Sequence, residues 1–163
     1  MKTLLLIRHA KSSWEVPGTN DFDRPLNERG KTDAPSMAGR LVSRKIQINY
    51  FIASPAKRAK KTAELFARQF LKDDKAIHFV ADLYHGGADA YSAAIAELDG
   101  NWATVALIAH NPGITEFANS LTTQRIDNIP TCGIFAVTAL VETWPEFADA
   151  KKNFLFFDYP KAG

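Results

Sequence analysis

Short apolar runs alternate along this chain with longer stretches of helical periodicity, and this alternation most strongly constrains the fold. The first run, residues 4–7 (LLLI), lies close to the start and ends at Arg8-His9. An apolar run without polar alternation is typical of a strand that is covered on both faces. Strands that alternate with helices indicate an α/β fold with a mostly parallel central sheet.

The predicted elements follow from the same patterns. Strands are expected at residues 2–8, 50–53, 77–80 and 104–109, and an edge hairpin at 133–141 and 153–157. Helices are expected at residues 28–44, from Ser54 to 70, at 88–98 and at 113–121. Pro35 predicts a kink or a late start in the first helix, and Ser54-Pro55 predicts an N-cap followed by proline at the first helical position. A polar loop at residues 12–25 is long enough to line a site.

Length and composition limit the classes of protein that fit. The 163 residues predict one domain, residues 1–163. The net charge of +2, from 20 basic and 18 acidic residues, points to neither nucleic acid nor a membrane surface as a partner. No stretch resembles a signal peptide or a membrane span. Cys132 is the only cysteine, so no internal disulfide is expected, and a cytoplasmic location is favoured.

Two histidines occupy the same topological position. His9 follows the first strand, and His110 follows the strand at 104–109 and precedes a helix start. The carboxyl ends of strands are where open α/β sheets place their functional residues. Either histidine alone would be interpreted as a hydrogen-bonded structural residue. Together, at two strand ends, they predict one shared pocket.

The helix expected after Ser54 opens with an unusual series of cations. Between Ser54 and Glu64 there is no acidic residue. The basic residues in this segment are Lys57, Arg58, Lys60 and Lys61. Because helix N-termini favour acidic side chains, these cations are locally unfavourable unless some of them face a bound anion. A solvated face is the alternative interpretation of the lysines. Arg58 is the strongest candidate, because a guanidinium matches phosphate oxygens bidentately.

The inventory of Arg8, His9, Arg58 and His110 suits phosphoryl transfer, in which the catalyst positions the group and stabilises the charge on its oxygens. The motifs that hold these residues are Arg8-His9-Ala10-Lys11-Ser12, residues 23–30 (DRPLNERG), residues 54–63 (SPAKRAKKTA) and His110-Asn111-Pro112-Gly113. In this order they resemble the histidine phosphatase superfamily, and the second and fourth resemble its small SixA-type phosphohistidine phosphatases. The resemblance implies a three-layer α/β/α, phosphoglycerate mutase-like fold.

The resemblance also implies a mechanism. His9 would attack phosphorus and carry a covalent phosphohistidine intermediate that water hydrolyses. For this, His9 must be neutral, with its other ring nitrogen donating to a backbone carbonyl. Arg8, Arg58 and a protonated His110 would bind the nonbridging oxygens, with Ser12 and the backbone N–H of Asn111 as further contacts. No metal and no cofactor are expected.

One departure from the wider superfamily bears on the substrate. Many members place a glutamate after the third strand as general acid, but residues 81–86 (ADLYHG) contain none. Asp82 and His85 are the candidates for this acid, although Asp82 also suits a turn-capping role. A phosphoramidate releases an imidazole, which needs less help from an acid than an alcohol does. The favoured partner is therefore a phosphohistidine protein.

Three alternatives remain open at the level of sequence. They are a phosphomonoesterase that acts on a small phosphorylated substrate, a mutase, and a non-catalytic phosphate-binding regulatory module. Asp21-Phe22-Asp23 resembles the Asp-x-Asp motif of another phosphatase class. That motif should follow the first strand directly, and here a loop intervenes.

Overall fold

The computed structural model describes residues 1–15, 17–71 and 77–162, and a mixed sheet forms the centre of this part of the chain. The strand order is β3-β2-β4-β1-β5-β6. Neighbours from β3 to β1 are parallel, whereas β5 is antiparallel to both β1 and β6. The strands are β1 (Lys2–Arg8), β2 (Tyr50–Ala53), β3 (Ile77–Phe79), β4 (Thr104–Ala109), β5 (Ile134–Ala139) and β6 (Asn153–Asp158). The predicted mostly parallel sheet and its edge hairpin are confirmed.

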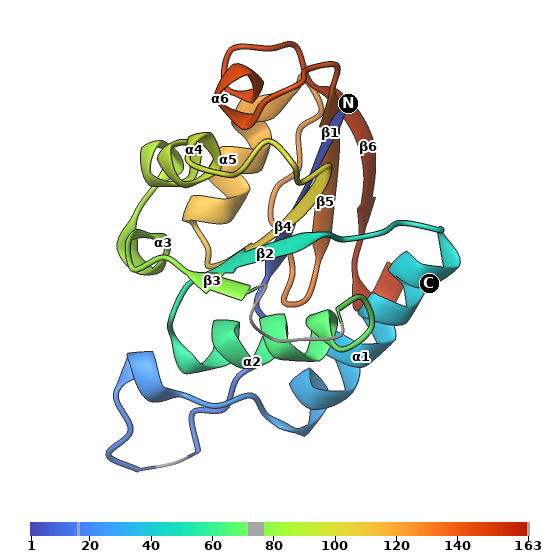
Figure 1. Ribbon diagram of the computed structural model, residues 1–163. Helices are drawn as coiled ribbons and strands as arrows, with labels where there is room; N and C mark the ends of the chain where they lie inside the picture. The colour runs from blue at the N-terminus through green and yellow to red at the C-terminus, as the bar shows by residue number, and fades with distance from the viewer. Residues whose placement is uncertain (16, 72–76, 163) are drawn as a thin grey trace.

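Helices cover both faces of this sheet (Figure 1). One face carries α1 (Glu28–Ser43) and α2 (Lys57–Ala67). The other face carries α3 (Asp82–His85), α4 (Ala88–Ala96), α5 (Gly113–Leu121) and α6 (Trp144–Phe147). Two short 3-10 helices are η1 (Asp21–Asp23) and η3 (Pro160–Ala162). The arrangement is the predicted three-layer α/β/α fold.

Successive side chains of β1 point into two separate cores. Leu4 and Leu6 pack in the cluster beneath α4 and α5, and Leu5 and Ile7 pack in the cluster beneath α1 and α2. All four side chains are completely buried. A strand with a core on each face needs no polar alternation, which explains the continuous apolar run in the sequence.

One helix start agrees with the sequence prediction and one differs. The helix α1 begins at Glu28, the start of the predicted range 28–44, and continues through Pro35, so the alternative of a late start at this proline is wrong. Asn27 caps the helix by accepting a hydrogen bond from the Gly30 N–H at 2.8 Å. The helix α2 begins at Lys57, and its N-cap residue Ala56 provides no side-chain hydrogen bond. Ser54 does not cap α2, because its hydroxyl lies 2.7 Å from a ring nitrogen of His110.

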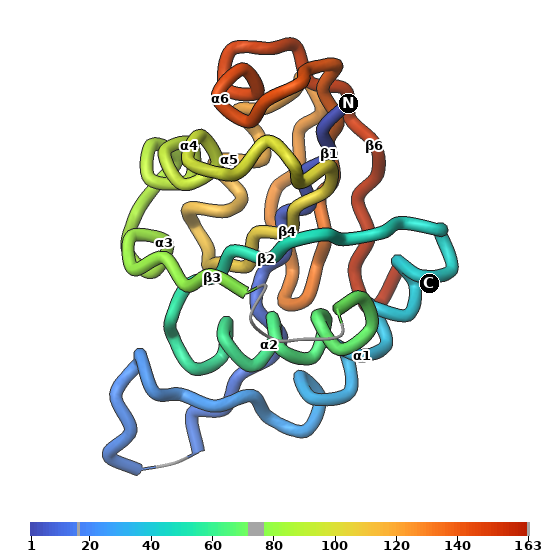
Figure 2. The backbone as a smooth tube through the Cα atoms, viewed as in Figure 1, coloured from blue at the N-terminus to red at the C-terminus, as the bar shows by residue number. Residues whose placement is uncertain are grey.

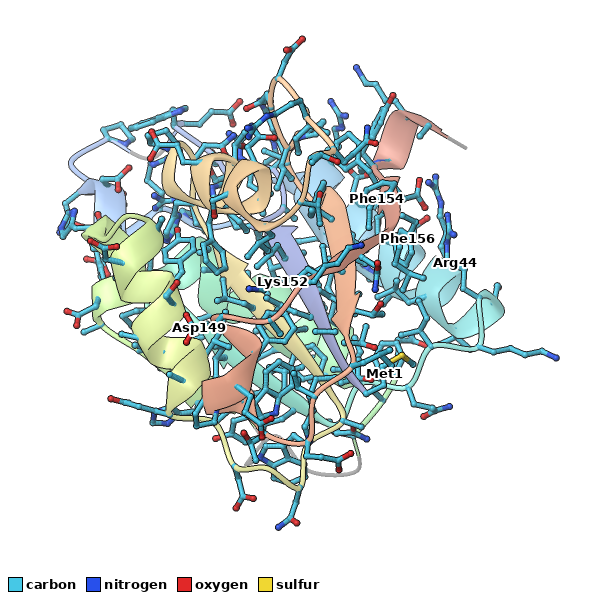
Figure 3. All side chains as sticks on the ribbon, turned by 90° about the horizontal axis from the view of Figure 1, so that it is seen from above. Met1, Arg44, Asp149, Lys152, Phe154 and Phe156 are labelled. Atoms are coloured by element: carbon cyan, nitrogen blue, oxygen red, sulfur yellow. The ribbon has the colours of Figure 1, made fainter. Side chains whose placement is uncertain are left out.

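The β6 edge of the sheet is fastened to α1 by charged side chains. The carboxylate of Asp158 is 3.0 Å from Arg40 and 3.6 Å from Arg44. The Arg44 guanidinium also lies over the ring of Phe156, 4.2 Å from its centroid (Figure 3). These contacts hold the last strand against the helical layer.

The long first loop lies beside α2 (Figure 2). Of the predicted range 12–25, residue 16 lies outside the described residues. The loop returns to its starting point, because Ser12 and Leu26 form an isolated antiparallel bridge. Gly30 lies against this closure: a Cβ atom there would be 2.2 Å from the carbonyl oxygen of Lys11. The close approach therefore requires glycine at this position.

Gly30→Ala should destabilise the protein, because the added methyl group must push α1 away from the Lys11 carbonyl. We expect a loss of about 1–3 kcal/mol in the free energy of unfolding, measured by urea titration. Gly39→Ala is the matched control. A Cβ atom at Gly39 meets nothing within 4 Å, and alanine favours a helix interior, so this variant should be neutral or more stable. Equal effects of the two substitutions would contradict the predicted clash.

Candidate active site

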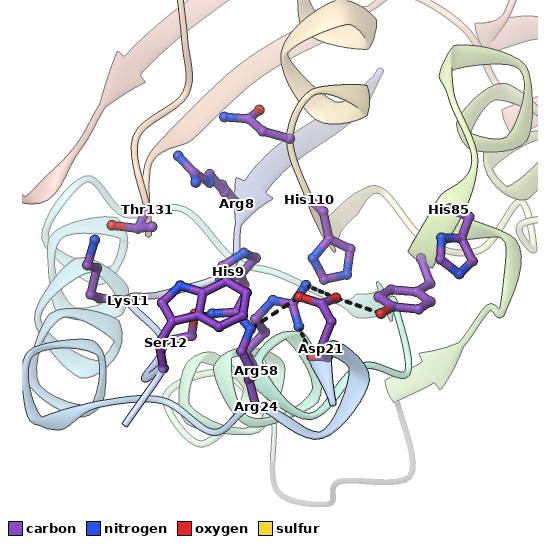
Figure 4. A pocket seen from close by; sticks show the side chains of 13 residues that line it. Arg8, His9, Lys11, Ser12, Asp21, Arg24, Arg58, His85, His110 and Thr131 are labelled. Atoms are coloured by element: carbon purple, nitrogen blue, oxygen red, sulfur yellow. Dashed lines mark hydrogen bonds and ion pairs between the residues drawn. The ribbon is translucent and has the colours of Figure 1, made fainter. Parts of the chain in front are cut away.

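A pocket of about 420 Å³ opens at the carboxyl ends of the parallel strands. His9 follows β1, His110 follows β4, and Arg58 projects from α2, which follows β2. Figure 4 shows these side chains converging from three different elements. The lining residues are Arg8, His9, Lys11, Ser12, Trp14, Asp21, Arg24, Arg58, Tyr84, His85, His110, Asn111 and Thr131. The structure thus brings together the four residues that the sequence singles out first.

His9 is held in one tautomer. Its Nδ1 lies 2.7 Å from the carbonyl oxygen of Ala10. Because a carbonyl oxygen can only accept, Nδ1 carries the hydrogen and Nε2 carries a lone pair. The side chain is only 6% exposed, and this burial lowers the pKa of His9 to about 3. At neutral pH the imidazole is therefore uncharged, with one nitrogen free to act as a nucleophile.

The second turn of α2 positions the segment that carries His9. The buried Thr62 hydroxyl accepts a hydrogen bond from the Ala10 N–H at 3.0 Å and donates to the Arg58 carbonyl at 2.7 Å. From the other side, the backbone N–H of Cys132 donates to the His9 carbonyl at 3.0 Å. The histidine is thus held at a set distance from the helix that supplies Arg58.

Three buried nitrogen atoms of the pocket have no hydrogen-bond partner. They are the only such side-chain atoms in the described part of the chain: Arg8 Nε, Arg58 Nε and His110 Nδ1. Buried N–H groups without partners are costly and rare in native proteins. Three of them in one pocket, two on guanidinium groups, are accounted for by a bound anion with several oxygen atoms.

The tautomer of His110 follows from its contact with Ser54. His110 Nε2 lies 2.7 Å from the Ser54 hydroxyl, which also accepts a hydrogen bond from the Ala56 N–H at 3.2 Å. Ser54 is completely buried, so its hydroxyl hydrogen needs an acceptor within the protein, and Nε2 of His110 is the acceptor beside it. Nε2 therefore accepts, and Nδ1 carries the hydrogen.

The protonation state of His110 differs from the sequence expectation. Burial, followed by the charge of Arg58, lowers its pKa to about 4. The ring is therefore neutral near pH 7 in this pocket, whereas the sequence analysis expects an imidazolium. A neutral His110 still offers the Nδ1–H as a donor, and the positive charge comes from the arginines.

Asp21 has no predicted role from the sequence, yet it organises one wall of the pocket. Its carboxylate accepts hydrogen bonds from Tyr84 at 2.6 Å, from Arg58 at 3.0 Å and from Arg24 at 3.1 Å. The Tyr84 hydrogen bond contributes most, with Arg58, to lowering the pKa of Asp21 to about 2. Asp21 is therefore a fixed negative charge rather than a proton donor. The segment that resembles SixA-type proteins, residues 23–30, contains Arg24 but begins after Asp21.

The secondary candidates lie in the pocket, but their side chains are engaged. The Ser12 hydroxyl accepts from Arg24 at 2.7 Å, and the Arg24 guanidinium stacks on the exposed Trp14 ring, 3.4 Å from its centroid. The Asn111 side chain donates to Asn128 at 2.5 Å and to the Ile129 carbonyl at 3.1 Å. These contacts make Asn111 a brace for the loop that follows β4.

The two candidate acids are separated by the structure. His85 lines the pocket, with its ring centroid 4.1 Å from that of Tyr84. Asp82 is exposed at the start of α3 and does not line the pocket, so it is a poor candidate for the general acid. The backbone carbonyl of Asp82 accepts from the Gly86 N–H at 2.8 Å, as in a tight turn.

The described residues contain neither a metal-binding cluster nor a membrane-spanning helix. In residues 1–15, 17–71 and 77–162, no group of three or more His, Cys, Asp or Glu side chains is arranged to hold a metal ion. Within the same ranges, no helix has the length and apolar character needed to cross a membrane.

The fold is that of an α/β enzyme, with two arginines and two histidines in the pocket at the carboxyl ends of its parallel strands. The family model of the histidine phosphatase superfamily (branch 1) matches residues 4–86, and the chain belongs to this superfamily. The protein is thus an enzyme of phosphatase type. A relative in Arabidopsis thaliana, an uncharacterized chloroplastic protein, is 28% identical over 89% of this chain and 70% of its own length.

Solved structures share the phosphoglycerate mutase-like fold over nearly the whole chain. A putative phosphohistidine phosphatase SixA from Agrobacterium tumefaciens has a TM-score of 0.82 at 25% identity and covers 98% of each chain. The corresponding protein from Nakamurella has a TM-score of 0.85 at 21% identity, covering 99% of this chain and 97% of its own. The protein histidine phosphatase SixA complexed with tungstate has a TM-score of 0.82 at 22% identity, covering 98% and 97%.

Acidification from pH 6.5 to 5 should lower the free energy of unfolding through His9 and His110. Their pKa values of about 3 and about 4 in the folded protein lie below the usual 6.5, so the unfolded chain takes up protons first. The stabilisation is complete above pH 6.5 and is lost as the pH falls, by up to about 1.4 kcal/mol per pH unit for each histidine. Urea titrations in a phosphate-free buffer measure this slope. The variant His9→Asn/His110→Asn should show a shallower slope, and an unchanged slope would refute the assignment.

Proposed function

We propose that this protein hydrolyses phosphohistidine in proteins through a covalent intermediate on His9. The observation that carries the proposal is the state of that side chain. It is neutral, its Nδ1–H is bound to the Ala10 carbonyl, and its Nε2 lone pair is free within a pocket that contains two arginines. A nucleophile prepared in this way suits attack on a phosphoryl group.

The reaction would proceed in two displacements. In the first, Nε2 of His9 forms a bond to phosphorus while the bond from phosphorus to the substrate imidazole breaks, and the released imidazole takes up a proton from His85 or from solvent water. In the second, water attacks the phosphorylated His9, giving inorganic phosphate and restoring the free imidazole. The Nε atoms of Arg8 and Arg58 and the Nδ1–H of His110 would bind the nonbridging oxygens.

The surroundings of the leaving group favour a phosphoramidate. Asp21 is held ionised and Asp82 lies outside the pocket, which leaves His85 as the candidate acid. A site with so little acid suits an imidazole leaving group better than an alkoxide. The similarity to SixA phosphohistidine phosphatases supports the same substrate class.

A small-molecule phosphomonoesterase is the second candidate. It is favoured by His85, which lines the pocket and would serve as the acid that an alkoxide leaving group needs. A mycobacterial glucosyl-3-phosphoglycerate phosphatase shares the fold, with a TM-score of 0.72 at 15% identity over 95% of this chain and 97% of the other. At that identity the likeness concerns the fold, so the phosphohistidine substrate remains our first proposal.

His9→Asn should reduce turnover of phosphoramidate and of a histidine-phosphorylated peptide by at least about 10³-fold, because it removes the nucleophile. Rapid quenching of the wild type with a ³²P-labelled donor should trap label on the protein in an acid-labile, base-stable form. Failure to trap label, or activity retained in His9→Asn, would exclude the covalent mechanism. Faster hydrolysis of an alkyl phosphate than of the phosphopeptide would favour the phosphomonoesterase.

Ser54→Ala should allow His110 to populate both neutral tautomers, because the hydroxyl that donates to Nε2 is lost. We expect kcat to fall roughly tenfold with little change in KM, since a mispositioned donor acts mainly on the transition state. The ¹⁵N chemical shifts of the His110 ring provide the independent measurement and should change from a single tautomer to a mixture. A single Nδ1–H tautomer in the variant would show that Ser54 does not control it.

A further inference from the structure

A second groove lies next to the pocket along one side of α2. Its volume is about 430 Å³. It is lined by Pro25 and Leu26 from the end of the first loop, and by Lys31, Lys57, Lys60, Lys61 and Glu64. The four α2 residues are spaced i, i+3, i+4 and i+7, so they share one face of the helix. Four ammonium groups and a single carboxylate make this groove basic.

The lysines of α2 are not paired with acidic side chains in the described part of the chain. Lys57, Lys60 and Lys61 form no ion pair there, and Glu64 is the single carboxylate that lines the groove with them. The Lys60 ammonium lies 5.6 Å from the centroid of the Phe79 ring, and Lys31 is 3.5 Å from Glu28. The charge on the α2 side of the groove is therefore open to an external anion.

These lysines also work against the stability of α2. The first turn contains no acid, and the N-cap residue Ala56 provides no side-chain hydrogen bond. Cations at this end of a helix oppose its dipole. The phosphate pocket uses Arg58 but none of the three lysines, so neither the helix nor the pocket accounts for them.

Two peptide bonds join the lining of the groove to the lining of the pocket. Arg58 lines the pocket while the preceding residue, Lys57, lines the groove; Arg24 and Pro25 have the same relation. A protein that presents a phosphohistidine to His9 therefore brings its neighbouring residues within reach of the groove. Opposite charge there would orient the two proteins and speed their association.

We propose that this groove binds an acidic stretch of the phosphorylated protein substrate, next to its phosphohistidine. The inference rests on the proposed phosphohistidine phosphatase activity. It adds a preference that the pocket alone does not provide, because a small phosphoramidate occupies the pocket without reaching the groove.

Peptides of equal length carrying one phosphohistidine, flanked by three glutamates or by three lysines, test the proposal. The wild type should prefer the acidic peptide about tenfold or more in kcat/KM, mainly through KM. The double variant Lys57→Glu/Lys61→Glu should lose or reverse this preference. It should fold, because the change at Lys57 places a carboxylate in the first turn of α2, where it favours the helix dipole and offsets the repulsion between the two new carboxylates. Its thermal midpoint should be close to that of the wild type.

Lys151→Glu/Lys161→Glu is the matched control, since both lysines are exposed, lie outside the groove and give the same change in net charge. This variant should keep the wild-type preference. Turnover of phosphoramidate should change by the same small factor in both double variants. The proposal would be overturned if the control lost the preference for the acidic peptide, or if Lys57→Glu/Lys61→Glu kept it.

Binding of the unphosphorylated peptides, measured by fluorescence anisotropy, separates the groove from the chemistry. Tighter binding of the acidic peptide by the wild type, lost in Lys57→Glu/Lys61→Glu, supports the groove even if the phosphopeptides are not hydrolysed. Hydrolysis of both phosphopeptides with equal affinity and equal kcat/KM would overturn the groove and leave the proposed function standing.

Discussion

The parallel pairing of β1 with β4 is the contact on which the site depends. Arg8 lies opposite Ala109 in the register of the two strands, and the next backbone N–H, that of His9, donates to the Ala109 carbonyl at 3.1 Å. The residues that follow are therefore forced to lie side by side, and the His9 and His110 rings are 5.1 Å apart between centroids. On the other side of β4, the Ser54 N–H donates to the Ile108 carbonyl at 3.0 Å, which places its hydroxyl beside His110.

Around these paired strands, the positive charge of the pocket lies on arginine side chains, whereas His9 and His110 are neutral. Burial and the nearby guanidinium groups disfavour imidazolium at both rings. Asp21 compensates part of the arginine charge, and the Tyr84 hydroxyl and Arg24 hold its carboxylate in place. A neutral nucleophile beside fixed cations and buried unpaired donors is an arrangement preorganised for an anion.

The sequence could predict a residue when its role followed from the order of elements. The apolar runs located the strands, and the strand ends located His9 and His110. Arg58 was found because a cation is out of place near a helix N-terminus. The prediction failed for Ser54, since the pattern Ser-Pro at a helix start is the same whether the hydroxyl caps the helix or binds a distant histidine. Asp21 was missed because its partners come from the end of the first loop, from α2 and from α3, and nothing in their spacing along the chain indicates that they meet.

The order of residues along the chain was enough to establish an α/β fold, the strand ends that carry the chemistry and the superfamily to which the chain belongs. These features depend on local periodicity and on contiguous motifs, which are written directly in the sequence. The tertiary structure was needed to establish the tautomers of His9 and His110, the ionised state of Asp21, the position of Asp82 outside the pocket, and the groove along α2 that Lys57, Lys60 and Lys61 line. Each of these depends on burial and on side chains that are far apart in the sequence, so each is defined only once the strands have paired and the helices have packed against them.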